Sequence, residues 1–349
     1  MCNIAGYVGT RDAAPILIEM LKREEGFAGG YYSGIATIHE GKIYYAKLTG
    51  DIDRLLALTE AAKLPGKIGI IHTRSKSGGG DEWSHPFVSQ ACGAGEIDCA
   101  YVANGSMGIF QSMIDKSIRK AEQLIAQGYV MRSRDRFETD YPTLSDGSCV
   151  HMSDLMCANI QHNVDLGMTP PRAMEEAFCE LPGEIVGLLL HRATPDEIHW
   201  SRINMPMFLG FAPHGAYLAT SALAFPSDAD EEILLPAQFS GSVSKDRYTA
   251  IPYRVPTEKK LGKTNPTIIA SAYTIIHDLL AQGEKHFGDV YKSISPLYKD
   301  CDYNDCEPLA YHILQALAKE GMLEIHTARV PGVTDGLTAP RTTFSLKKG

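Results

Sequence analysis

The residues best suited to covalent chemistry stand at the start of the chain. The sequence opens MCNIAGYVG, so Cys2 directly follows Met1, which is readily removed when the next residue is small. Cys2 would then carry a thiol and a free α-amine. An amine with a pKa near 8 can take the proton of a thiol with a pKa near 8.5, which makes the pair a nucleophile with its own base. If Met1 were retained, Cys2 would have no free amine to act as this base.

Such a nucleophile needs a cation for a substrate carboxylate, donors for an oxyanion and an anion for a substrate amine. Arg74 follows the apolar run KIGII and precedes three glycines at 78–80, which form a candidate lid. A guanidinium offers a fork of donors that matches a carboxylate, although an ordinary surface arginine at a strand end explains Arg74 equally well.

Two further motifs offer the remaining groups. In YVANGSMGIF, Asn104 and Gly105 end an apolar run. Asn-Gly is first of all a turn signal, but an amide beside an unhindered glycine N–H can direct two donors at one oxyanion. In RFETDYPTL, Asp140 follows Thr139, a pair that is also favoured at a helix N-terminus. Taken alone, each motif has an ordinary structural explanation.

The elements that must position these residues fall into two zones. From Asn3 to about Ser244, β-branched apolar runs alternate with glycine-rich turns, and helical patterns such as AAPILIEMLKREE occur in blocks, which favours an α+β fold of packed sheets flanked by helices. Beyond the polar stretch PTEKKLGKTNP, three helical patterns and two short strands resemble a winged helix. We therefore expect a domain over 1–250, a linker over 251–266 and a winged-helix-like module over 267–349.

Composition excludes several functions. With 349 residues, a net charge of −9 and no apolar run long enough for a membrane span, we expect a soluble, cytoplasmic protein without a signal peptide, and nucleic-acid binding is disfavoured. The eight cysteines are irregularly spaced, which favours reduced thiols. Cys301 and Cys306 lack the second pair of ligands that a structural zinc site needs, so we expect no metal and no cofactor.

In combination, Cys2, HTR, HPF, NG and ETD resemble, in order and spacing, the glutaminase domain of class II glutamine amidotransferases, and in particular the N-terminal half of glutamine:fructose-6-phosphate aminotransferase. The resemblance extends to about residue 225 and includes GGYYSGIA and LATSALA. It implies the four-layer αββα sandwich of the N-terminal nucleophile hydrolases.

The resemblance also implies a role for each motif. Cys2 is the nucleophile, Asn104 with Gly105 the oxyanion hole, Arg74 the anchor of the glutamine carboxylate, Asp140 the partner of its α-amine, and Thr73 and His85 line the pocket. Some positions depart from the family pattern: Asn3 replaces a glycine, Ser75 a frequent tryptophan, and Gly29 and Tyr32 an arginine and an aspartate. Trp83 is a candidate substitute for the missing lid aromatic.

The function that follows is hydrolysis of the glutamine side-chain amide through a γ-glutamyl thioester. Alternatives are an ammonia-donating subunit of a separate synthase, such as a split glutamate synthase, a γ-glutamyl amide hydrolase, and a catalytically retired, glutamine-responsive regulator. The helix EPLAYHILQALAKEG offers DNA little beyond Gln315 and Lys319, so a docking or homodimerisation role for the module is the preferred expectation.

Overall fold

The computed structural model describes residues 2–105, 110–255, 260–299 and 301–347. A first antiparallel sheet is built of β1 (Asn3–Gly9), β2 (Tyr32–His39), β3 (Lys42–Thr49), β4 (Ile68–Arg74), β9 (Phe208–Ala212), β10 (Gly215–Ala219) and β11 (Glu231–Leu234). Its seven strands lie in the spatial order β11-β9-β10-β1-β4-β2-β3. The strand that follows Cys2, β1, is therefore the central strand of this sheet, with β10 on one side and β4 on the other.

A second antiparallel sheet faces the first. It comprises β5 (Phe87–Ser89), β6 (Cys99–Gly105), β7 (Glu184–His191), β8 (Ile198–Arg202), β12 (Phe239–Ser244), β13 (Arg247–Tyr248) and β14 (Ile251–Pro252). The order is β13-β12-β8-β7-β6-β5, with β14 also paired to β12. Long apolar runs explain these strands, because a sheet that is covered on both faces needs apolar residues at nearly every position.

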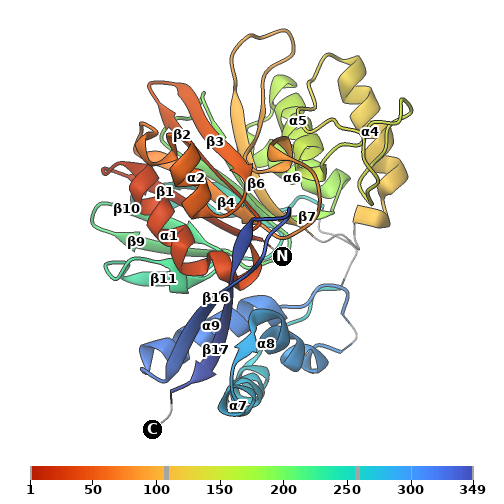
Figure 1. The fold of residues 1–349 in the computed structure, drawn as a ribbon. Helices are drawn as coiled ribbons and strands as arrows, with labels where there is room; N and C mark the ends of the chain where they lie inside the picture. The colour runs from red at the N-terminus through yellow and green to blue at the C-terminus, as the bar shows by residue number, and fades with distance from the viewer. Residues whose placement is uncertain (1, 106–109, 256–259, 300, 348–349) are drawn as a thin grey trace.

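Helices cover the outer faces of both sheets (Figure 1). On the first sheet lie α1 (Ala13–Ala28) and α2 (Ile52–Leu58), and on the second α4 (Ile114–Ala126), α5 (Met152–Asp165) and α6 (Pro170–Glu180). Short 3₁₀ turns span Ala61–Lys63, Asp81–Trp83, Ala222–Ala224 and Ser295–Leu297. The two sheets thus pack between two helical layers, the arrangement that the resemblance implied.

The C-terminal elements form a separate small unit. They are α7 (Pro266–Ala281), β15 (Lys285–His286), α8 (Phe287–Ile294), α9 (Cys306–Lys319), β16 (Leu323–Pro331) and β17 (Thr338–Leu346), and their strands pair in the order β15-β17-β16. We call this unit, residues 266–347, the C-terminal module. The three helices and two final strands follow the predicted pattern, and the short strand β15 adds one that the sequence did not indicate.

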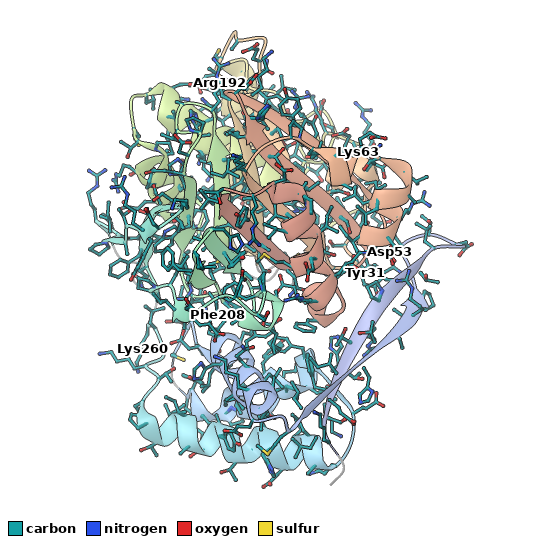
Figure 2. All side chains as sticks on the ribbon, turned by 90° about the vertical axis from the view of Figure 1, so that its left-hand side faces the viewer. Tyr31, Asp53, Lys63, Arg192, Phe208 and Lys260 are labelled. Carbon is teal, nitrogen blue, oxygen red and sulfur yellow. The ribbon has the colours of Figure 1, made fainter. Side chains whose placement is uncertain are left out.

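The C-terminal module packs against the end of α1. The Phe27 ring lies 5.0 Å from that of Phe344 and 6.2 Å from that of Tyr311. Gly30, at φ +92°, passes so close to Pro340 that an added Cβ would lie 2.6 Å from its Cδ. Figure 2 shows the β16–β17 hairpin rising beside the sandwich toward Tyr31 and Asp53. Glycine is therefore needed where the last strand meets the first helix.

Candidate active site

Strand register brings the predicted nucleophile and the predicted cation together. Asn3 of β1 pairs with Thr73 of β4, so that Cys2, one residue earlier, lies beside the end of β4, where Arg74 stands. Both residues line a cavity of about 430 Å³. His85 and Gly105 line the same cavity, so four of the predicted site residues meet there.

Arg74 is a buried cation with unused hydrogen-bonding capacity. Its side chain is 2% exposed, and Nη1 donates to the Trp83 carbonyl at 2.8 Å. The guanidinium carbon lies 4.5 Å from the centre of the Tyr32 ring. Nη2 has no hydrogen-bond partner in the described part of the chain. Because an unsatisfied buried guanidinium is costly, this nitrogen is suited to receive an anion such as a carboxylate.

The histidines around Arg74 are held neutral. Burial lowers the pKa of His72 to about 3, and burial also lowers the pKa of His85 and of His151 well below the usual range. The His72 and His85 rings stack at 3.8 Å, and the nearby charge of Arg74 disfavours a second cation. Arg74 therefore supplies the fixed positive charge of this wall, whereas the imidazoles offer neutral polar edges.

Asn104 and Gly105 take different positions at the end of β6. The Asn104 side chain accepts from the Cys2 N–H and donates to the Cys2 carbonyl, each at 3.3 Å, and it does not line the cavity. Gly105 lines the cavity, and a side chain there would collide with the Phe110 ring. Asn104 thus holds the backbone of Cys2, while Gly105 leaves space beside it.

Two predicted pocket residues lie elsewhere. Thr73 is buried, and its hydroxyl accepts the Gly30 N–H at 2.6 Å, so it serves the backbone next to Gly29 and not the cavity. A side chain at position 29 would collide with Thr73, which explains the glycine there. Asp140 is exposed and does not line the cavity, and its neighbour Tyr141 does. Neither Thr73 nor Asp140 therefore lines the cavity, and their roles in binding glutamine stay predictions.

Trp83 packs beside Arg74 and outside the cavity. It is 1% exposed, packs edge-on against Tyr141 and His151 at 5.1 and 5.4 Å, and does not line the cavity. Trp83 is therefore too deeply buried to act as the lid aromatic that we expected it to replace. Ser75 and the loop that follows line the cavity in its place.

Sequence reasoning missed much of the cavity wall. Residues that the sequence did not indicate make up the rest of the lining, namely Ser77, Ala103, Phe110, Tyr141, His151, Ser153, Ile185, Asn204, Met205, Tyr291, Asp302, Tyr303, Asn304 and Glu307. The last five belong to the C-terminal module, so this module closes one side of the cavity.

No helix in the described ranges is both long and apolar enough to cross a membrane.

Comparison with known proteins links the chain to glutamine-using enzymes, although no protein-family model matches it. The chain is 30% identical over 251 residues to the glutamine–fructose-6-phosphate aminotransferase of Pyrococcus horikoshii, covering 71% of this chain and 37% of that protein. For the protein of the same name from Zymomonas mobilis the identity is 29%, covering 64% and 32%. The chain spans about a third of the length of these curated relatives.

Two solved structures share the fold. The glutamine phosphoribosylpyrophosphate amidotransferase of B. subtilis matches with a TM-score of 0.58 and 17% identity, covering 80% of this chain and 58% of that one. The allosteric regulatory enzyme of purine biosynthesis matches with a TM-score of 0.57 and 15% identity, covering 81% and 59%. Over about 70% of its length the chain is therefore similar in sequence to glutamine–fructose-6-phosphate aminotransferases, and it shares the fold of solved class II glutamine amidotransferases.

Proposed function

We propose that this protein hydrolyses the side-chain amide of L-glutamine, with Cys2 as the nucleophile. The observation that carries the proposal is one cavity lined by Cys2, by Gly105 and by the buried, unsatisfied guanidinium of Arg74. A nucleophile, a site for an oxyanion and an anchor for a carboxylate are the groups that amide hydrolysis of an amino acid requires.

Each step uses a group at the cavity wall. The glutamine α-carboxylate binds Nη2 of Arg74, which fixes the substrate. The α-amine of Cys2, freed by removal of Met1, takes the thiol proton, and Asn104 holds that amine through its side-chain oxygen. The Cys2 sulfur attacks the amide carbon, and the Gly105 N–H stabilises the oxyanion, while Asn104 holds the Cys2 backbone in place. Ammonia leaves with the proton, and water hydrolyses the thioester to glutamate.

The test is intact-mass analysis after incubation with 6-diazo-5-oxo-norleucine, a glutamine mimic that alkylates such cysteines. We expect protein that lacks Met1 to gain one adduct, which peptide mapping assigns to Cys2, and Cys2→Ala to gain none and to release no ammonia. The exposed thiols of Cys92 and Cys179 are internal controls. Labelling there, or full hydrolysis by Cys2→Ala, would overturn the assignment.

We further propose that the winged-helix-like module serves the sandwich and not nucleic acid. The Gln315 amide donates to Glu232 at 3.1 Å, and the Lys319 ammonium pairs with the same carboxylate at 3.0 Å. The two α9 side chains best suited to bases and phosphates are therefore engaged by β11. Full-length protein should show no salt-dependent binding to duplex DNA, and such binding would contradict this role.

A further inference from the structure

The cavity has two chemically different walls. The sandwich contributes the cation Arg74, whereas the C-terminal module contributes the two carboxylates of the described lining, Asp302 and Glu307. Tyr291 and Tyr303 of the module lie on the same side. A cavity with a cationic wall and an anionic wall is suited to a ligand that carries opposite charges at separated positions.

Of the two carboxylates, Glu307 has an oxygen without a hydrogen-bond partner in the described residues. It lies in the first turn of α9, where a helix dipole favours an acid, yet its Oε2 is buried and makes no hydrogen bond within the described residues. Burial raises the pKa of Glu307 to about 7. Asp302 differs, because it is exposed and one of its oxygens accepts the Lys260 N–H at 2.8 Å. A cation placed at Glu307 would compensate its burial.

The α-amine of glutamine is not the cation that we expect at Glu307. The α-amine and the α-carboxylate share one carbon, so a partner for the amine has to lie next to Arg74. The charge of Arg74 acts on the pKa of Tyr32 and of Tyr141 on the sandwich wall, whereas the pKa of Glu307 is set mainly by burial. Glu307 stands on the other wall, contributed by a different part of the chain.

The size of the cavity agrees with a longer ligand. Its volume of about 430 Å³ falls within the roughly 300–1,000 Å³ of sites that hold drug-sized molecules. Glutamine is smaller than the molecules that cavities of this size hold. A substituent on the glutamine side-chain nitrogen would extend from the reacting carbon into this remaining space.

We propose that the module wall, through Glu307, binds a positively charged amine on the leaving-group side, so that the enzyme accepts γ-glutamyl amides of diamines in addition to glutamine. This inference rests on the proposed glutaminase function. Cys2 sulfur bonds to the γ-carbonyl carbon and the carbon–nitrogen bond breaks. The diamine leaves with the thiol proton, and water hydrolyses the thioester to glutamate and free thiol.

The test compares three substrates with the full-length enzyme: glutamine, γ-glutamylputrescine and γ-glutamylpentylamine, whose tail has the same length without the charge. We expect kcat/KM for the charged tail to exceed that for the neutral tail about tenfold, the size of one partly desolvated charge pair. In Glu307→Gln this preference should disappear, while hydrolysis of glutamine changes little. Glu320→Gln, at the other end of α9, is the matched control.

The outcomes separate this inference from the function on which it rests. Equal rates for the two tails in the parent, or a preference that survives in Glu307→Gln, would overturn the subsite while glutamine hydrolysis stands. A loss of all three activities in Glu307→Gln would mean a structural role for Glu307. No hydrolysis of glutamine and no adduct on Cys2 in the parent would overturn both proposals.

A second measurement needs no variant. Free putrescine should inhibit glutamine hydrolysis by the parent enzyme more strongly than the uncharged 1,4-butanediol does, by about tenfold in inhibition constant, because only the diamine brings a positive charge to Glu307. Equal inhibition by the two compounds would contradict the subsite.

Discussion

The sandwich and the C-terminal module contribute to one cavity in different ways. The sandwich side carries Cys2 and a buried cation held by strand pairing and aromatic rings, so its geometry is set by the most rigid part of the molecule. The module side carries carboxylates and tyrosines on α8, on the segment before α9 and on its first turn. In the proposed function the reacting groups therefore lie on the sandwich and the groups that select the substrate lie on the module, and the two parts pack against each other through α1 and through β11.

The largest effect should come from breaking that interface. Phe27→Ala removes a buried ring that contacts Phe344 and Tyr311, and cavity formation at such a site costs about 3–5 kcal/mol. Chemical denaturation should show this loss in the free energy of unfolding. Leu58→Ala on α2, with a side chain that is 60% exposed, should change stability by less than about 0.5 kcal/mol. Equal stability of Phe27→Ala and parent would mean that the two bodies are independent.

The sandwich wall is tested by its cation. Arg74→Ala should raise KM for glutamine about hundredfold with a smaller change in kcat, because the carboxylate contact is made in the ground state as well as in the transition state. Arg74→Lys should recover part of the loss. Arg134→Ala, which removes a surface pair with Asp146 and a hydrogen bond to Ser148 away from the cavity, should have wild-type kinetics. Unchanged KM in Arg74→Ala would remove this residue from glutamine binding.

A pH effect should appear where α1 meets the start of α2. Burial raises the pKa of Glu25 to about 8, so between pH 4.5 and 8 the folded state holds a proton that the unfolded state has released. Stability therefore falls as the pH rises through this window, by about 2 kcal/mol between pH 6 and pH 8. Glu25→Gln should flatten that part of the profile. Thermal melts measure this effect, and the same dependence of stability on pH in Glu25→Gln and in the parent would refute this account.

The smallest effect concerns the contact of α9 with β11. Lys319→Ala removes an exposed ion pair with Glu232, and such pairs contribute at most about 1 kcal/mol. Because the Gln315 contact with the same carboxylate remains, we expect nearly unchanged melting and unchanged glutamine kinetics. A large loss of activity would show that this contact, and not the packing of Phe27, holds the module wall in place.

Part of this picture was predictable from the sequence for a physical reason. The resemblance placed Cys2, Arg74 and Gly105 in one site, and because each stands next to a strand end, the strand pairing brings them to one cavity. Asp140 stands in an irregular segment, where no period tells which side chain points inward, and the structure directs Tyr141 to the cavity instead.

The module wall could not be read from the sequence. Glu307 has the sequence pattern of an ordinary acid in the first turn of a helix, and only tertiary packing brings it to the same cavity as Cys2, about three hundred residues earlier in the chain. Gly29 gives the converse case. Its departure from the family pattern resembles a loss, but a side chain there would collide with Thr73.

The packing of β17 on α1 also determines when the molecule can finish folding. The residues that cover Phe27 and lie close to Gly26 and Gly30, near 340–344, are synthesised long after α1. Until they arrive, the end of α1 presents uncovered apolar surface to the solvent, which favours self-association of unfinished chains. A truncation that removes β17 should therefore cause aggregation, although β17 contributes no group to the cavity.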